Sequence, residues 1–346
     1  MNILKKLLKI FLIILAAALL LVLAAYLCLL GRSGDYTDES GSYTHIDSRN
    51  SFTFICAHPG LAGLGEDVLP WDGSMLNTLV RPLKLKLLIP FLGKHEETVV
   101  DSINYTIDRY EDGSAEFLSY YSEAEIAADP SKTDTGLLYY HTADGAPFVV
   151  ICPGGSFTFV GVVSSGYPYV QTLQDAGYNV FILEYRVGAR DGEEDKTPSV
   201  DRASEDLLSA VTYILSHAGE LAVSSADYLV LGSSAGGQLT ARYCAEGNFA
   251  ALGLPAPAGC IMLYPANCQK YDYSGCSVPM FITVCADDPQ INVAGLDTAV
   301  AAMEAAGMAV SYTKFETGGH SFGLGVGTPA EGWLERAIAW MEPYVR

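Results

Sequence analysis

The sequence predicts an α/β fold in which a mostly parallel sheet is covered by helices on both faces. Three observations favour this class. From about residue 136, short apolar runs alternate with stretches of helical length, which is the spacing of βαβ units. Parallel strands are buried on both faces, and continuous apolar runs suit such strands. The chain also contains 34 glycines and only 17% charged residues, which suits tight turns around a buried sheet.

The predicted strands span residues 147–152, 179–184, 228–231, 260–264, 279–285 and 310–315. The predicted helices span residues 166–176, 200–218, 236–246, 294–307 and 330–343. In open sheets of this class, sites form at the carboxyl ends of the strands. We therefore expect the functional residues in the loops that directly follow these strands.

Composition divides the chain into four parts. Residues 136–346 form the predicted α/β core, and residues 51–135 form an N-terminal extension. Residues 31–50 are rich in Ser, Gly, Asp and Tyr, which is typical of a polar tether. Residues 1–30 are an apolar segment. With 346 residues, half of them hydrophobic, the chain is long enough for one large domain with an additional layer.

The apolar segment is long enough to cross a membrane. Residues 10–30 contain no charge, and a transmembrane helix needs roughly 20 residues. Lys5, Lys6 and Lys9 precede this run, which predicts a cytoplasmic N-terminus and an extracytoplasmic domain. No small-x-small cleavage site follows, so we expect an uncleaved anchor. The alternative is a cleaved signal peptide and a secreted protein.

The extension carries three weaker patterns. Residues 102–110 and 115–121 alternate in polarity around a turn, which predicts the first hairpin of the sheet. The Gly- and Pro-containing segment 58–72 is expected to pack against the sheet, with a lid over the site or a wall of the acyl pocket as the alternatives. Residues 76–92 predict a core helix, with contact to a membrane surface as the alternative because basic residues interrupt the apolar ones.

Charge and cysteine usage exclude several classes of function. The formal net charge is −20, and residues 31–346 carry −23, so nucleic acid is not expected as a partner. The eight cysteines show no CxxC spacing, and no H-E-x-x-H motif or phosphate loop occurs, so neither a metal nor a cofactor is implied. Cys268 and Cys276 flank a polar loop, and a disulfide between them is an open alternative in an oxidising compartment.

The strongest local motif is Gly232-Ser233-Ser234-Ala235-Gly236, which follows a predicted strand and opens a predicted helix. This G-x-S-x-G arrangement is typical of a nucleophile elbow, where a strained turn exposes a serine hydroxyl. Tiny residues must stand two positions either side of the nucleophile. Gly232 and Gly236 satisfy this requirement for Ser234, whereas Ser233 has Leu231 at that position. We therefore predict Ser234 as the nucleophile.

A serine nucleophile needs a base and an orienting acid. His320 is the one histidine after Ser234, and it lies in a Gly-rich loop behind the last predicted strand. The order Ser, acid, His then requires an acid between them. Asp287 and Asp288 directly follow a strand. We predict Asp288, with Asp287 as the alternate, to orient the imidazole and stabilise its cation.

Acyl transfer also needs donors for an oxyanion. Residues 152–157, Cys-Pro-Gly-Gly-Ser-Phe, follow the first strand of the regular region, and their glycines permit close backbone approach. We predict that the N–H groups of Gly154, Gly155 and Ala235 form the oxyanion hole.

These motifs together resemble the esterase/lipase branch of the α/β-hydrolase superfamily, and most closely its bacterial acetyl-esterase-like group. The resemblance covers about residues 136–346 and rests on the ordered segments 153–157, 184–186, 232–237, 286–289 and 319–323. It implies an α/β-hydrolase fold and places the acid on Asp288. The chain departs from the family at the oxyanion loop, where Cys152 and Pro153 precede two glycines and Ser156 instead of a histidine with three glycines.

The sequence therefore predicts a membrane-anchored serine hydrolase that cleaves carboxylic esters of small or medium acyl groups through an acyl-enzyme on Ser234. The expected partners are a small-molecule ester and, through the N-terminal helix, a membrane. Two alternatives remain: a serine peptidase on the same fold, and a non-catalytic binding protein on a hydrolase scaffold.

Overall fold

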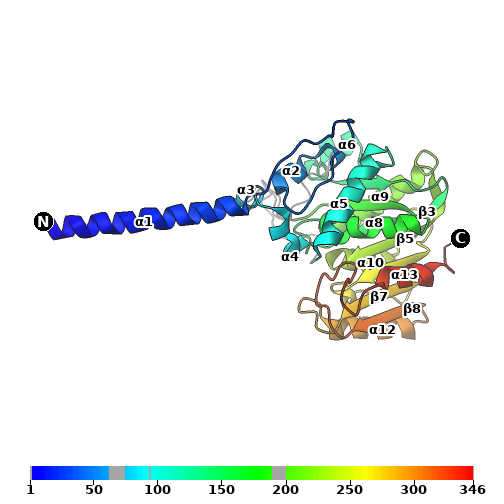
Figure 1. The fold of residues 1–346 in the computed structure, drawn as a ribbon. Coiled ribbons are helices and arrows are strands. Elements are labelled where there is room, and N and C mark those ends of the chain that lie inside the picture. The colour runs from blue at the N-terminus through cyan, green and yellow to red at the C-terminus, as the bar shows by residue number, and fades with distance from the viewer. Residues whose placement is uncertain (1, 62–74, 93–94, 189–199, 346) are drawn as a thin grey trace.

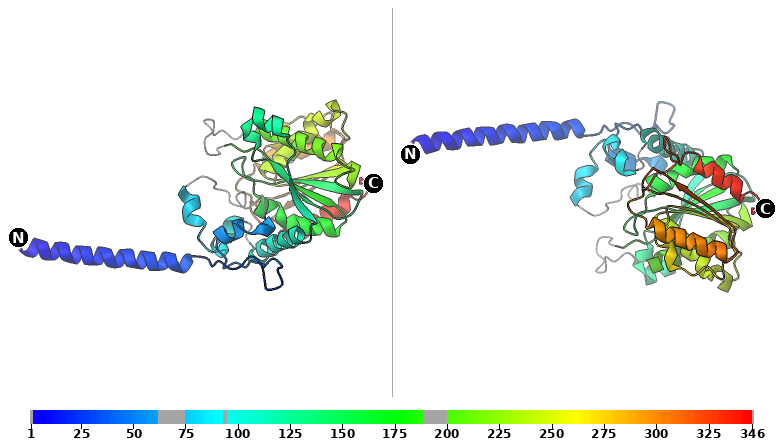
Figure 2. Two further views of the ribbon diagram at one scale, coloured as in Figure 1. Left: turned by 90° about the horizontal axis from the view of Figure 1, so that it is seen from above. Right: turned by 90° about the horizontal axis from the view of Figure 1, so that it is seen from below.

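The computed structural model describes residues 2–61, 75–92, 95–188 and 200–345 (Figure 1). A long helix, α1 (Asn2–Leu29), projects from a domain that is built around a single sheet. Figure 2 shows from two further directions that α1 leaves the domain on one side, whereas the C-terminus lies on the opposite side.

The sheet has eight strands among the described residues, in the order β1-β2-β4-β3-β5-β6-β7-β8. β2 pairs antiparallel with β1 and β4, whereas the strands from β4 through β3 to β8 pair in parallel. Their bounds are β1 Ala115–Leu118, β2 Gly136–Tyr140, β3 Ala146–Cys152, β4 Asn179–Glu184, β5 Val223–Ser233, β6 Gly259–Leu263, β7 Met280–Cys285 and β8 Val310–Phe315.

Helices cover both faces of the sheet (Figures 1 and 2). On one face lie α5 (Glu96–Glu111), α8 (Tyr167–Asp175) and α13 (Trp333–Met341); on the other lie α9 (Val200–Ser216), α10 (Ala235–Glu246) and α12 (Val293–Ala305). Shorter helices are α2 Phe52–Cys56, α3 Met75–Val80, α4 Ile89–Leu92, α6 Glu123–Ala128, α7 Val162–Ser165 and α11 Asn248–Ala251, with 3₁₀ turns η1 Pro59–Leu61, η2 Leu85–Leu87, η3 Pro130–Lys132 and η4 Cys268–Lys270. The predicted fold class is confirmed.

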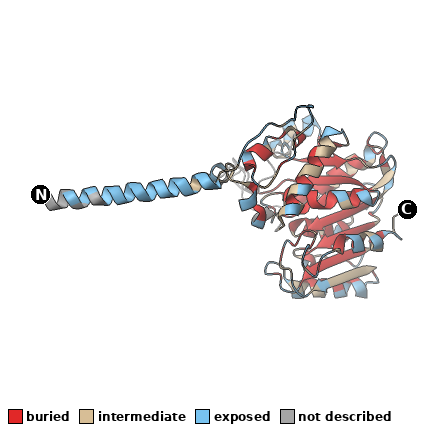
Figure 3. Ribbon diagram, viewed as in Figure 1, coloured by how far each residue is buried: buried red, intermediate tan, exposed pale blue. Residues whose placement is uncertain are grey.

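The core lies in the sheet and on its two faces. Every residue of β2, β4, β6 and β7 is buried, as Figure 3 shows by colour, and most of their side chains are apolar without alternation. The carboxyl ends of the parallel strands form one edge, where loops from β3, β5, β7 and β8 meet. This edge carries the candidate site.

The predicted hairpin is wrong in its first half. Residues 102–110 belong to helix α5, because Val99, Ile103 and Ile107 recur at helical spacing and are buried on one face. Ser102 and Thr106 lie on the same face, and each hydroxyl donates a hydrogen bond to a backbone carbonyl one turn earlier. The polar alternation over a few residues imitated a strand. β1 pairs with β2 instead.

The segment expected to be a tether is packed into the structure. Arg32 N–H donates to the Arg49 carbonyl and Ser51 N–H donates to the Arg32 carbonyl. Residues 81–86 lie along this segment, with Leu85 N–H donating to the Asn50 carbonyl. Backbone contact is so close that a Cβ on Gly31 would lie 2.3 Å from the Cα of Ser51. The polar composition therefore marks a hydrogen-bonded surface segment and not an open linker.

Two further predictions on the extension have partial answers. Of the segment 58–72, residues 62–72 lie outside the described residues, so the lid remains a prediction. His58 at its start is buried, with Nε2 3.0 Å from the Thr44 carbonyl oxygen.

Residues 76–92 do not form one core helix, because Pro82 and Pro90 interrupt the pattern and the segment forms α3, η2 and α4. Cys268 and Cys276 are both unbonded thiols.

Candidate active site

Ser234 stands at the sharp turn between β5 and α10. Its backbone has φ +54° and ψ −113°, a conformation that residues other than glycine rarely adopt. The backbone packs tightly around Ser234. A Cβ on Gly232 would lie 2.2 Å from the Gly236 carbonyl oxygen, and a Cβ on Gly236 would lie 1.8 Å from the Cys152 carbonyl oxygen. Glycine at both positions is therefore a steric requirement of the turn that presents the Ser234 hydroxyl.

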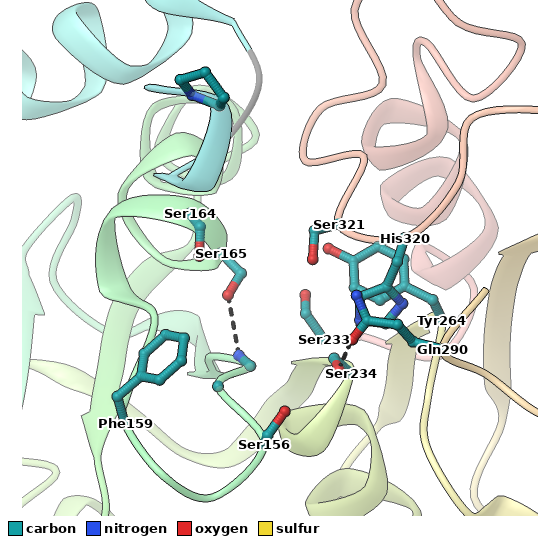
Figure 4. Close-up of a pocket in the computed structure, with 13 residues that line it drawn as sticks. Ser156, Phe159, Ser164, Ser165, Ser233, Ser234, Tyr264, Gln290, His320 and Ser321 are labelled. Carbon is teal, nitrogen blue, oxygen red and sulfur yellow. Dashed lines mark hydrogen bonds between the residues drawn. The ribbon is translucent and has the colours of Figure 1, made fainter. Parts of the chain in front are cut away.

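His320 lies directly against this hydroxyl. Its Nε2 is 2.9 Å from Ser234 Oγ, and its Nδ1 is 2.8 Å from Asp288 Oδ2 (Figure 4 shows the first of these contacts). The His320 and Asp288 side chains are almost fully buried. The ring of Tyr264, at the end of β6, packs against the imidazole with a centroid separation of 4.8 Å. Three loops thus bring together the serine, histidine and acid that the sequence analysis grouped.

The environment of Asp288 favours a carboxylate. Burial alone would raise its pKa, but the hydrogen bond with His320 and the N–H groups of Gln290 and Ile291 hold the pKa below its usual value. Asp288 therefore carries a negative charge at neutral pH and faces His320 Nδ1.

The neighbouring Asp287 has a different place. Its two carboxylate oxygens accept hydrogen bonds from the N–H groups of Gly318 and Gly319, at 3.3 and 2.8 Å. It does not contact the imidazole; it fixes the loop that precedes His320. The alternate acid of the sequence analysis is thus a loop-holding carboxylate.

One of the predicted oxyanion donors, the N–H of Gly154, already has a hydrogen-bond acceptor. The N–H of Gly154 donates to Ser165 Oγ at 3.0 Å, and Ser165 itself lines the cavity (Figure 4). Gly155, with φ +141°, and Ser156, with φ +56°, then turn the chain sharply. Among the described residues, the N–H groups of Gly155, Ser156 and Ala235 have no acceptor. These three N–H groups are therefore open to an acceptor, whereas that of Gly154 already has one.

A cavity of about 240 Å³ opens onto these groups. Small polar side chains dominate its wall, and Phe159 and Tyr264 supply aromatic surface (Figure 4). Pro90, from α4 of the extension, also lines it. The described residues contain no cluster of His, Cys, Asp and Glu that could hold a metal ion.

Several supporting residues escaped the sequence analysis. Ser165 in α7 and Pro90 belong to no motif, and neither position carries a local signal. Tyr185, in the quoted segment 184–186, was given no role, yet its hydroxyl donates to the Pro153 carbonyl at 2.7 Å and holds the oxyanion loop.

The comparisons with known proteins agree with this architecture. A solved acetyl ester-xyloside bifunctional hydrolase from Caldicellulosiruptor lactoaceticus superposes with a TM-score of 0.56 at 18% identity, covering 67% of this chain and 97% of that one. The carboxylesterase Cest-2923 from Lactobacillus plantarum WCFS1 gives 0.53 at 20% identity, with coverages of 61% and 94%. This chain has the α/β-hydrolase fold.

A third solved structure and a family model also match this chain. The esterase Est2 of the planctomycete Thermogutta terrifontis matches the α/β-hydrolase domain with a TM-score of 0.51 at 19% identity, covering 67% of this chain and 91% of that one. A family model described as BD-FAE matches residues 138–254, from β2 to just beyond α11. No curated protein matches the sequence. The predicted resemblance to the esterase/lipase branch is thus confirmed at the level of the fold.

Proposed function

We propose that this protein is a serine hydrolase that cleaves carboxylic esters of small acyl groups. The observation that carries the proposal is the continuous chain of contacts from Asp288 through His320 to Ser234, with hydrogen bonds of 2.8 and 2.9 Å. A buried carboxylate, an imidazole and a strained serine in this order form the arrangement that activates a hydroxyl for attack on a carbonyl.

The geometry suggests a two-stage reaction. His320 Nε2 accepts the proton of Ser234 as its oxygen attacks the ester carbonyl, and Asp288 stabilises the resulting imidazolium. The N–H groups of Gly155, Ser156 and Ala235 stabilise the oxyanion. His320 then protonates the leaving alcohol, and an acyl group remains on Ser234. Water, activated by the same imidazole, releases the acid and restores the serine.

The cavity supports a small acyl group. A volume of about 240 Å³ is below the roughly 300–1,000 Å³ of typical drug-sized sites, and its serines suit a short chain better than a long one. Three similar solved proteins are an acetyl ester-xyloside hydrolase, a carboxylesterase and an esterase, which also supports ester chemistry.

The decisive test is Ser234→Ala, with Ser233→Ala as the matched control one position away. Ser234→Ala should abolish fluorophosphonate labelling and p-nitrophenyl acetate hydrolysis, with a loss on the order of 10⁴–10⁶ in kcat. Ser233→Ala should retain most activity. An acyl-length series on p-nitrophenyl esters then measures the preferred chain. Cleavage of peptide amides in preference to esters would indicate a peptidase, and absence of labelling in the wild type would indicate a non-catalytic scaffold.

We further propose that α1 anchors the protein, with the domain outside the cytoplasm. Among the described residues, Phe11–Leu29 is the one span long and apolar enough to cross a membrane, and none of it is buried. The preceding lysines favour this orientation. Fractionation, N-terminal sequencing and protease treatment of intact cells test it. A mature N-terminus between residues 25 and 40 would mean a secreted enzyme, and an intact soluble cytoplasmic protein would refute the anchor.

A further inference from the structure

The end of the apolar helix is joined directly to the segment that leads to the active site. Lys84 N–H donates to the Leu29 carbonyl at 3.1 Å, and Lys84 Nζ donates to the Cys28 carbonyl at 2.8 Å. Both carbonyls belong to the last turn of α1, where they have no partner within the helix. Gly31 N–H donates to the Pro82 carbonyl at 2.8 Å. With Phe11–Leu29 in a bilayer, residues 82–84 therefore lie at its surface.

Exposed apolar side chains flank this junction. Leu79 is 54% exposed and Leu87 is 37% exposed, each four residues from Leu83, which pairs with Leu30 in an antiparallel bridge. The segment is also basic where the rest of the domain is acidic. Residues 75–92 contain three basic side chains and no acidic one, whereas residues 31–346 carry −23. Lys86 Nζ reaches Glu96 at 3.2 Å but stays 63% exposed. An apolar and basic surface in an acidic body complements anionic phospholipid.

The same segment reaches the catalytic cavity. Pro90 lines that cavity and stands six residues after Lys84, so at most about 22 Å of extended chain separates it from the end of α1. The carboxyl edge of the parallel strands also faces the side from which α1 projects (Figures 1 and 2). The cavity and the membrane span thus lie on the same side of the domain.

We propose that residues 79–92 rest on the phospholipid surface and hold the mouth of the cavity against it. The enzyme then takes esters of amphiphilic alcohols that reside in the leaflet, with the short acyl group in the serine-lined cavity and the apolar part of the alcohol left at the surface. This substrate class rests on the proposed esterase function, and the surface contact rests on the proposed membrane anchor alone.

Lipid contact is measured without any activity. The full-length protein is reconstituted in nanodiscs of phosphatidylcholine and phosphatidylglycerol, with or without bromine on the lipid chains. Leu87→Trp should lose fluorescence to brominated lipid beyond the wild-type background. Leu252→Trp is the matched control, because Leu252 is an exposed leucine, 56% accessible, in the loop after α11. It should show no extra loss. Equal quenching at the two positions would overturn the contact.

Kinetics test the substrate class. The variant Leu79→Glu/Leu87→Glu should lower kcat/KM for the acetate of a long-chain alcohol in the nanodisc by roughly tenfold, because acidic side chains are repelled by the anionic surface. Its kcat/KM for water-soluble p-nitrophenyl acetate should not change, and Leu252→Glu should alter neither rate. A bilayer rate equal to wild type would overturn the proposed substrate class. Failure of the wild type to hydrolyse either ester would refute the esterase function, while the quenching result would stand independently.

Discussion

The hydroxyl of Ser165 sits between two backbone groups of the neighbouring loops. It accepts a hydrogen bond from Gly154 N–H at 3.0 Å and donates one to the Gly161 carbonyl at 3.1 Å. Because Ser165 already accepts the Gly154 N–H, the next two N–H groups of the loop, those of Gly155 and Ser156, are the ones left without an acceptor. We therefore expect this side chain, which lies outside the group of Ser234, His320 and Asp288, to decide which N–H groups donate to the proposed oxyanion.

Ser165→Ala should therefore lower kcat for p-nitrophenyl acetate, by about tenfold, with a smaller change in KM. The buried Gly154 N–H loses its acceptor, which costs about 1–3 kcal/mol and lets the loop shift. Ser164→Ala is the control, since its hydroxyl also donates to the Gly161 carbonyl and lines the cavity but does not hold Gly154. Equal kinetics for the two variants would contradict this role of Ser165.

The lowered pKa of Asp288 predicts that the stability of the protein depends on pH. The Asp288 pKa is below the usual value, against the effect of burial, because His320 and two N–H groups favour the carboxylate. A carboxyl with a lowered folded-state pKa stabilises the fold above its unfolded pKa, about 3.9, and loses that contribution as pH falls through the folded value. The stability advantage of wild type over Asp288→Asn should therefore shrink as the pH falls below about 4. Urea unfolding at several pH values measures it.

The triad could be grouped from sequence because its members follow strands and obey a fixed order. Glycine at positions 232 and 236 excluded Ser233, and the steric contacts give the same register. The sequence could not separate Asp287 from Asp288 by residue type, since both are acids in one loop. Ser165 and Pro90 were missed because their roles depend on contacts between segments far apart in sequence, which no local pattern encodes.

At the scale of elements, a buried ion pair joins the end of β4 to α9. Asp206, fully buried in α9, accepts hydrogen bonds from Arg186 N–H at 2.6 Å and from Arg186 Nε at 2.9 Å. The Tyr121 hydroxyl donates to the same carboxylate at 2.7 Å. Arg186 also contacts Glu205, whose side chain is 54% exposed. Two adjacent acids therefore bind the same arginine, Asp206 in the buried interior and Glu205 at the exposed surface.

Asp206→Ala should destabilise the protein by about 3–5 kcal/mol, because it leaves the buried Arg186 charge without its main partner. Glu205→Ala, at the next position, should cost about 0–1 kcal/mol, since water screens the exposed pair. Denaturant unfolding of the two variants makes the comparison. Similar losses would mean that burial does not control the strength of these contacts.

Elements were predicted well where the hydrophobic pattern was long and continuous. The parallel strands of the core could be predicted from their continuous apolar runs, which alternate with stretches of helical length. Residues 102–110 failed because a short stretch of helix can imitate strand alternation. The distinction needed Val99, one turn earlier, whose spacing to Ile103 and Ile107 is helical.

At the scale of the whole molecule, the domain should fold without its apolar helix. The end of α1 is hydrogen-bonded to the domain at residues 82–84, but the sheet and its two helical layers are formed by later residues. A chain that begins at Gly31 should be soluble, should leave the membrane fraction and should hydrolyse p-nitrophenyl acetate with a kcat near that of the full chain. Loss of both solubility and activity would mean that α1 is part of the folding unit.

The docking of the N-terminal segments had no signal in the sequence. Polar composition at residues 31–50 is shared by linkers and by surface segments. The hydrogen bonds of this segment to residues 81–86 and to helix α5 separate the two cases. Such long-range pairing between irregular segments follows no periodicity.

The bonded junction at the end of α1 also changes how the enzyme would search for its substrate. A domain on a long flexible linker rotates freely and samples a volume of solution above the membrane. Here the domain would turn with α1, whose tilt in a bilayer averages about 20° for such helices. Encounters then come from lateral diffusion in a plane, so the turnover rate should follow the surface density of the ester and not its bulk concentration.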